Sequence, residues 1–294
     1  MPEPAFFVAS YGNDANPCTF GSPCKTFQQA VNAVDAGGEV TAIDSAGFGP
    51  IAITKAVTIT SPDGVEAGIV PVASGDAIDI NAGPNDAIVL RGLTLNGSGG
   101  GSNGILFNSG GSLTVTNCMM QDFALGGIAI EPTSGIADVV ITNTIASNIG
   151  PKGLGVGIRF SSNGIATINA VVDHVVTTGN EYGISFTPNS SNPTTVAISN
   201  SVASNNSETG IAGAASSESN LFVSIDNVTA SGNLFGIAMA GVARVVLGRS
   251  IITGNGTGIE NDTSPNSFFT YKDNRITGNS NLDISSPLST GVLQ

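Results

Sequence analysis

Short segments of the chain alternate a branched apolar residue with a small polar one. The pattern is seen in "LTVTN", "VVITN", "VAISN" and "VSIDN", and again in "GILF", "GIAI", "GIRF" and "GISF". A period of two indicates strands, because an amphipathic helix needs apolar residues three and four positions apart. Asn, Gly and Ser, which favour turns, bound these segments. The pattern therefore predicts many short strands.

The strands belong to a repeat. The phrase "NVTASGNLFGIAM" from Asn227 is similar to "NSVASNNSETGIAGA" from Asn200 and to "HVVTTGNEYGISF" from His174. One isoleucine, usually after Gly, marks each repeat, and the markers are Ile78, Ile105, Ile128, Ile158, Ile184, Ile211, Ile237, Ile259 and, more loosely, Leu282. Their spacing runs from 22 residues (237 to 259) to 30 residues (128 to 158), which is typical of a solenoid.

Repeats of this length with short strands and no helix predict a parallel β-helix of about nine coils. Marker residues and the apolar residues two positions later would then stack into one inward column. The expected pairs are Ile105 and Phe107, Ile128 and Ile130, Ile158 and Phe160, Ile184 and Phe186, and Ile237 and Met239. Each coil alone has too small a core, so neighbouring coils must stabilise one another.

A second column of residues lies at the end of the other strand in each repeat. Its expected members are Lys55, Gly92, Asn117, Asn143, His174, Asn200, Asn227, Arg249 and Asp273. Asn at a corner adopts a left-handed backbone and bonds its amide to an adjacent coil. We therefore interpret Asn117, Asn143, His174, Asn200 and Asn227 as a structural corner column. The single histidine, His174, is a substitute for Asn in this column rather than a general base.

Residues 1–38 differ from the repeats and predict a cap over the first coil. They contain a strand ("AFFVAS"), a loop and the segment "KTFQQAVNAV", in which Phe27, Ala30, Val31 and Val34 fall at helical spacing. A solenoid needs such a cap because open strand edges invite aggregation. We expect three parts: the cap at 1–38, the β-helix at 39–285 and a C-terminal tail at 286–294.

The cap sequence carries a specific resemblance. The run "FVASYGNDANPCTFGSPCKTFQQAVNAVDAGGEV" resembles the opening of secreted bacterial proteins in the pectate-lyase-like, right-handed parallel β-helix superfamily. An extended segment, a "GND" loop and a "P-x-K-T-F/I-Q-x-A" helix precede the coils there. The resemblance implies an all-β, single-stranded, right-handed parallel β-helix, and often contact with carbohydrate. It does not single out a reaction.

Composition and charge limit the classes of partner that this protein can bind. The net charge is −13, and only 11% of the residues are charged. An acidic, Lys-poor surface argues against nucleic acid and anionic membranes, whose phosphates need clustered Lys and Arg. It also disfavours a polyanionic substrate unless a cation bridges the two. No segment is apolar for long enough to span a membrane.

The cysteines bear on the compartment. Cys18 and Cys24 flank Gly and Pro in "PCTFGSPCK", and with no nearby His they favour a disulfide over a zinc site. We therefore expect an oxidising compartment and a protein that is secreted or on the bacterial cell surface. "MPEPAFFVAS" lacks the basic start and long apolar run of a signal peptide. We expect Cys118 to be unpaired and half buried.

Few residues suited to catalysis lie on the outward face of the strands that carry the marker isoleucines. Between Ile128 and Met239 its only charged residues are Arg159 and Glu131. A glycoside hydrolase needs two carboxylates flanking one bond, and Glu181 is the nearest partner for Glu131 in coil order. The "GHG" of polygalacturonase-like enzymes and the "DPH" of alginate epimerases are absent.

A polysaccharide lyase would need a base and a positive group or metal to stabilise an enolate. Arg159 would serve as that cation, Tyr182 as proton donor, and Glu131 or Glu181 as a calcium ligand. The alternative is that Arg159 pairs with Glu131 in the adjacent coil. No ligand cluster supports calcium, so we predict no metal and no cofactor.

Three hypotheses follow. The preferred one is a non-catalytic extracellular β-helix that presents its face to a polysaccharide or cell-surface glycan. The second is a polysaccharide lyase or related carbohydrate-active enzyme. The third is a trimeric phage or surface spike, in which Leu106, Val140, Val171 and Val246 would form an outward apolar seam.

Overall fold

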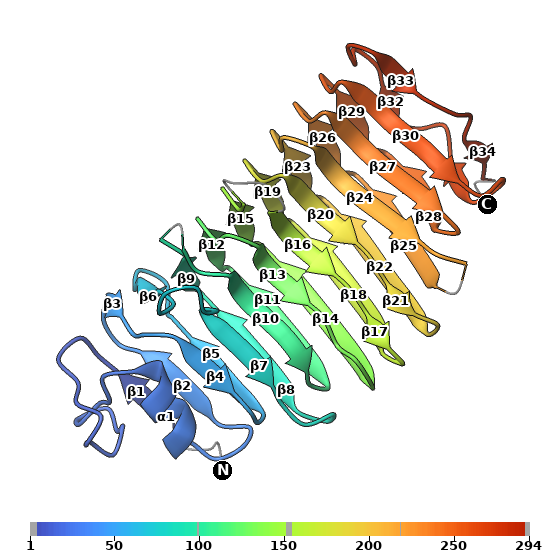
Figure 1. Cartoon of the computed structure of the whole chain (residues 1–294). Helices are drawn as coiled ribbons and strands as arrows, with labels where there is room; N and C mark the ends of the chain where they lie inside the picture. Colours follow the sequence, from blue (N-terminus) through green and yellow to red (C-terminus); the bar gives the residue numbers. More distant parts are fainter. Residues whose placement is uncertain (1–4, 99, 151–154, 218, 292–294) are drawn as a thin grey trace.

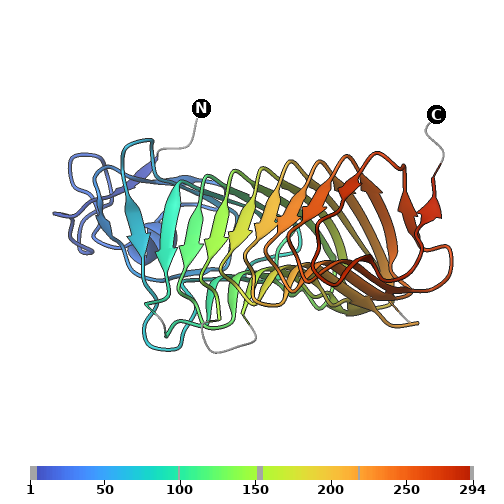
Figure 2. The same ribbon diagram turned by 90° about the horizontal axis from the view of Figure 1, so that it is seen from above.

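The computed structural model describes residues 5–98, 100–150, 155–217 and 219–291, so the first four residues of the expected cap and the last three of the expected tail lie outside it. The strands wind around one core in three long parallel sheets, and the chain advances from one end of a rod to the other (Figures 1 and 2). The predicted all-β solenoid of about nine turns is confirmed.

Each full turn contributes one strand to each sheet, here called sheets I, II and III. Sheet I contains β1 (Phe6–Val8), β2 (Glu39–Ala42), β5 (Val57–Thr60), β8 (Ala87–Arg91), β11 (Ser112–Thr116), β14 (Ile136–Thr142), β18 (Thr167–Asp173), β22 (Pro193–Ser199), β25 (Asn220–Asp226), β28 (Arg244–Gly248), β31 (Phe268–Thr270) and β34 (Ser289–Thr290). Sheet II contains β4 (Ile51–Ile53), β7 (Ile78–Asn81), β10 (Asn103–Ser109), β13 (Gly126–Ile130), β16 (Val156–Phe160), β20 (Tyr182–Phe186), β24 (Thr209–Ala215), β27 (Phe235–Gly241), β30 (Thr257–Thr263) and β33 (Leu282–Ile284).

Sheet III is built from shorter strands. It contains β3 (Ala46–Gly47), β6 (Ala67–Ile69), β9 (Leu93–Asn96), β12 (Met119–Gln121), β15 (Ile145–Ser147), β19 (Val176–Thr178), β23 (Val202–Ser204), β26 (Thr229–Ser231), β29 (Ile251–Thr253) and β32 (Arg275–Ile276). A small separate pair joins β17 (Asn163–Gly164) to β21 (Asn189–Ser190).

The marker isoleucines form the inward column of sheet II. Neighbouring markers from Ile78 to Ile259 are paired in register. The five inward pairs named from the sequence are at most 1% exposed. The last marker was wrong, because Leu282 lies opposite Thr257 and Ile284 lies opposite Ile259.

The corner column follows β11, β14, β18, β22 and β25 of sheet I. Asn117, Asn143, His174, Asn200 and Asn227 have φ values of 54°, 49°, 52°, 48° and 52°. Positive φ is unusual outside Gly, and Asn tolerates it best.

Both ends of the expected column were placed wrongly. Lys55 lies before β5 rather than after it, and its ammonium group donates hydrogen bonds to the carbonyls of Asn32 and Val34 at the end of the helix. Thr60 pairs with Arg91, so Ser61 aligns with Gly92. At the other end Leu247 pairs with Thr270, which puts Lys272, with φ 65°, opposite Arg249 in place of Asp273.

The second Asn of each repeat has a different role from the first. Asn180, Asn206, Asn233 and Asn255 are 1–5% exposed and lie between sheets III and II. The Oδ1 atom of Asn206 accepts from the backbone N–H and the Nδ2 of Asn180, at 3.2 and 3.1 Å. Its own Nδ2 donates to Asn233 Oδ1 and to the Thr177 carbonyl, at 3.1 and 3.3 Å.

These amides form one continuous ladder. The same pattern repeats from Asn233 to Asn255 and from Asn255 to Asn279. In the two preceding coils, buried Phe123 and Ile149 take the equivalent position. The ladder satisfies buried polar groups that would each cost about 1–3 kcal/mol if left unpaired.

The Gly before each marker isoleucine from Ile105 to Ile259 explains the recurring Gly-Ile step. A Cβ at Gly210 would lie 2.7 Å from the Gly236 carbonyl oxygen, 2.8 Å from the Ala203 carbonyl oxygen and 2.9 Å from Asn233 Nδ2. The equivalent atom at Gly183 would lie 2.4 Å from the Gly210 oxygen. Adjacent coils approach too closely here for any side chain.

The cap covers the first coil. Helix α1 (Phe27–Ala33) buries Phe27, Ala30 and Val31, and Thr26 caps its N-terminus by accepting from the N–H of Gln29. Asp14, the acidic residue of the "GND" loop, accepts from the N–H groups of Lys25 and Thr26. Strand β1 extends sheet I beyond β2.

The three cysteines have two different environments. Cys18 and Cys24 form a disulfide in the loop that leads from β1 to α1. Cys118 is 3% exposed, so it is fully buried rather than half buried. Burial raises the pKa of its thiol to about 11.

The glycine column generates the first prediction. Gly210→Ala should lower the free energy of unfolding by about 1–3 kcal/mol, because the methyl group would overlap fixed backbone atoms of the next coil. Urea unfolding followed by circular dichroism measures the change. Gly47→Ala, at a position with open space around the added atom, is the control and should stay near wild type; equal stability of the two variants would contradict this explanation.

The asparagine ladder generates the second prediction. Asn206→Ala should destabilise the protein by about 1–3 kcal/mol, because the buried backbone N–H of Asn180 loses its acceptor and the Asn180 side-chain amide keeps only its hydrogen bond to the Ala146 carbonyl. The exposed Asn220→Ala variant provides the matched control. Hydrogen exchange should show the lost protection concentrated around β20 and β24, and a uniform loss over the rod would argue against a local ladder.

Candidate functional site

A groove of about 650 Å³ crosses the outer face of sheet II from β16 to β30. One row of paired residues crosses it from strand to strand: Arg159, Ser185, Ala212, Ala238 and Glu260. The floor is hollow because the three central members of this row are small. Thr187, Ala214 and Ala240 widen the floor.

One wall of the groove carries larger side chains. Val156, Tyr182, Thr209 and Phe235 pair in register just before the glycine column. All four line the groove, with Val156 and Thr209 buried and Tyr182 and Phe235 partly exposed. The result is a trough with small residues below and two aromatic side chains along one side.

The charges lie at the ends and along this wall. Arg159 lines one end, Glu260 and Asp262 line the other, and Glu208 lies beside Tyr182 and Phe235. The Nε atom of Arg159 lies 2.7 Å from Glu131 Oε1, and its Nη2 atom lies 2.6 Å from the same oxygen. The two side chains are 23% and 29% exposed, so the pair is partly shielded.

Tyr182 has an altered acidity. Partial burial raises the pKa of its phenol, and the charges of Glu181 and Glu208 raise it further. Both causes disfavour the phenolate. The neutral hydroxyl is therefore available as a hydrogen-bond donor over a wide pH range.

The structure brings together some of the candidate residues and separates others. Arg159 and Tyr182 line the same groove, and Glu131 holds Arg159 from the adjacent coil. Glu181 instead lines a different depression with Asn205, Ser207 and Leu234. Its Oε2 atom is buried and makes no hydrogen bond within the described part of the chain. Among the described residues, neither Glu131 nor Glu181 belongs to a group of three or more His, Cys, Asp or Glu side chains arranged to hold a metal ion.

Sequence reasoning missed Glu208 and Phe235. Phe235 begins β27 in the register row of Tyr182, and Glu208 directly precedes β24 at the position equivalent to Glu181. Alignment with the candidates Tyr182 and Glu181 was the signal that would have found them.

His174 lies outside the groove, at the corner after β18. Its Nδ1 atom is 2.6 Å from Asp173 Oδ2, and its side chain is 59% exposed. A hydrogen bond from the Ser199 hydroxyl, with others from His174 and Asn200, lowers the pKa of Asp173 to about 2. The position of His174 agrees with a structural role.

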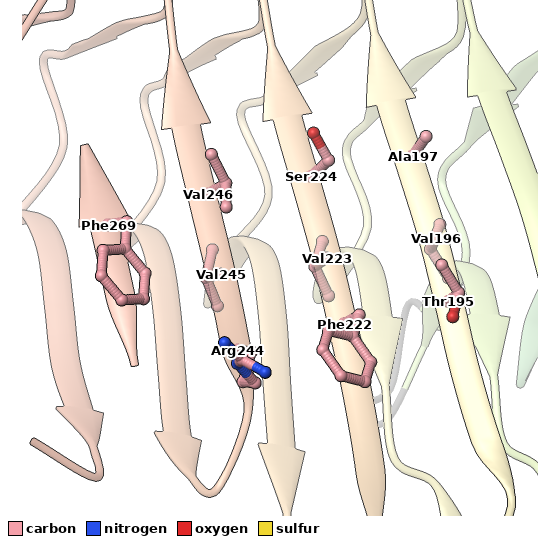
Figure 3. Close-up of a pocket in the computed structure, with 10 residues that line it drawn as sticks. All are labelled: Thr195, Val196, Ala197, Phe222, Val223, Ser224, Arg244, Val245, Val246 and Phe269. Carbon is pink, nitrogen blue, oxygen red and sulfur yellow. The ribbon is translucent and has the colours of Figure 1, made fainter. Parts of the chain in front are cut away.

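A second depression, of about 380 Å³, lies on the outer face of sheet I between β22 and β31 (Figure 3). The Arg244 guanidinium lies 5.3 Å from the centre of the Phe222 ring, and Phe269 lies on the other side of Arg244. Arg244 is its only charged lining residue among those described. This surface offers contact area rather than a set of groups for chemistry.

The expected trimer seam is split between two sheets. Val140 and Val171 are paired on sheet I and are 38% and 44% exposed, and Val246 lies farther along the same row. Leu106 belongs to β10 of sheet II. The four residues therefore cannot form one continuous seam.

Within the described ranges, no group of three or more His, Cys, Asp or Glu side chains is arranged to hold a metal ion. No helix among the same residues has the length and apolar character needed to cross a membrane.

Comparison with known proteins places this architecture in a family. The family described as "Right handed beta helix region" matches residues 76–229, and the chain belongs to it. A search of curated protein sequences found no match.

Several solved structures share the fold. Pectate lyase Pel9A superposes with a TM-score of 0.70 at 15% identity, covering 96% of this chain and 78% of the other. The A-module of mannuronan C-5 epimerase AlgE4 from Azotobacter vinelandii gives 0.56 at 14% identity, covering 88% and 91%. XylC in complex with xylose gives 0.55 at 9% identity, covering 88% and 70%. At these identities the similarity establishes the fold alone.

The environment of Tyr182 generates the third prediction. Tyr182 should ionise at higher pH than an ordinary tyrosine, and Glu208→Gln should lower its pKa by removing a nearby negative charge. An ultraviolet pH titration measures this, with Tyr182→Phe subtracted to isolate the signal. Glu39→Gln, on sheet I, is the control. An unchanged or higher pKa in Glu208→Gln would show that the carboxylate does not act on the phenol.

Proposed function

We propose that this chain is an extracellular β-helix that binds a polysaccharide or cell-surface glycan in the groove over sheet II, without catalysing a reaction. The observation that carries the proposal is the groove itself. It is long, open and floored by small residues, and it places Tyr182 and Phe235 along one wall. Aromatic side chains offer large contact faces at low entropy cost, and the polar groups between them orient a ligand.

The solved structures add support for carbohydrate. Their names refer to pectate, mannuronan and xylose. The disulfide near the N-terminus agrees with an oxidising, extracellular setting.

The pairing of Arg159 favours binding over lyase chemistry. A lyase needs a positive group to stabilise the enolate that forms beside a carboxylate. The Arg159 guanidinium contacts Glu131 at 2.6–2.7 Å, which offsets that charge. The carboxylates that line the groove lie away from this pair. Glu208 is beside Tyr182 and Phe235, and Glu260 and Asp262 are at the far end.

A polysaccharide lyase remains the second candidate because Arg159 and Tyr182 line one groove. In that case Arg159→Ala would abolish the release of unsaturated uronate products. The same variant would retain lyase activity if Arg159 only forms the ion pair with Glu131.

The fourth prediction tests the binding groove. Ala212→Trp should fill the floor and weaken glycan binding by at least ~10-fold, equivalent to about 1.4 kcal/mol. Isothermal titration against a panel of neutral, amino and acidic oligosaccharides measures affinity, and ultraviolet absorbance of the same mixtures detects lyase products. Thr114→Trp, on the outer face of sheet I, is the control and should bind as wild type. Binding without product supports the proposal, and turnover or the absence of any binding contradicts it.

A further inference from the structure

The charges of the groove specify the ligand further. Four charged residues line it: Arg159, Glu208, Glu260 and Asp262. The single cation among them is already matched by Glu131. The three carboxylates take part in none of the ion pairs formed by the described residues. The groove is therefore net negative.

The arrangement concentrates this charge at one end. Glu260 and Asp262 are two positions apart on β30, so both side chains leave the same face of the strand. The adjacent floor residues, Ala238 and Ala240, contribute neither charge nor hydrogen-bonding groups. A ligand that reaches this end meets two carboxylates over an apolar floor.

We infer that the groove selects a glycan that carries protonated amino groups and no carboxylates, such as an oligomer of glucosamine. This inference rests on the proposed glycan-binding function. An ammonium group near Glu260 and Asp262 is attracted by both carboxylates, whereas a uronate there is repelled by them. The net charge of −13 acts on the approaching chain in the same direction.

The hydroxyl of Tyr182 fits the same ligand. Its raised pKa keeps it neutral, so it donates to a sugar oxygen without adding charge. Phe235, in the same register row, offers an apolar face for a sugar ring. Recognition would thus combine stacking along the wall with charge pairing at the β30 end.

The experiment compares three probes at about pH 5.5. The probes are a glucosamine hexamer, the N-acetylglucosamine hexamer that differs from it only in the amino groups, and a galacturonate hexamer with and without calcium. We expect the glucosamine oligomer to bind at least ~10-fold more tightly than the acetylated one. Salt should weaken the difference, because screening acts on exposed charges.

Variants assign the effect to the groove. The double variant Glu260→Gln with Asp262→Asn should lose the preference for the glucosamine hexamer over the acetylated hexamer. The double variant Glu39→Gln with Asp63→Asn removes the same charge elsewhere on the surface and should keep the preference. If both variants weaken binding equally, the effect comes from net charge and the assignment to the groove is wrong.

The outcomes separate the inference from the proposed function. Equal affinity for the two hexamers, or tighter binding of galacturonate with or without calcium, overturns the inference and leaves glycan binding in place. Absence of binding to every probe and to the wider glycan panel overturns the proposed function itself.

Discussion

The structure depends on hydrogen bonds that run from one coil to the next. Parallel strands supply them along the three sheets, but at the turn between sheets III and II the backbone N–H groups have no strand partner. The side-chain oxygens of Asn206, Asn233 and Asn255 accept from these N–H groups across the coil boundary. Because each amide also donates to the next one, no coil can shift its register without breaking buried bonds on both sides.

The glycine column is the steric counterpart of this ladder. Amide bonding at about 3 Å requires adjacent coils to approach closely at the next residue. A side chain at Gly183 or Gly210 would occupy space that already holds a backbone oxygen and a ladder amide. Two residue types at fixed positions in a repeat thus hold the spacing on which the outer face of sheet II depends.

The fold was predictable because its cause is local and repeated. The period-two pattern indicates strands, and the regular return of a Gly-Ile step places markers such as Ile105 and Ile128 in register. The ends were harder to predict: Leu282, Lys55 and Asp273 were misplaced because the terminal coils have no Gly-Ile step or corner Asn to mark the register. The ladder was not predicted because the sequence alone does not show which Asn residues are buried. Asn206 is buried in the ladder, whereas Asn200 is exposed at the corner.

The candidate site was predictable only in part. Arg159 and Glu131 stand out as charges on a neutral face, and their pairing follows from adjacent coils. The groove instead arises from the absence of bulk at Ser185, Ala212 and Ala238, which are far apart in sequence and adjacent in space. The groove also lies over the part of the rod in which the amide ladder runs. Its floor therefore repeats at the strand spacing of about 4.8 Å. A linear polymer whose units advance by a similar distance would place each successive unit against an equivalent position of the groove.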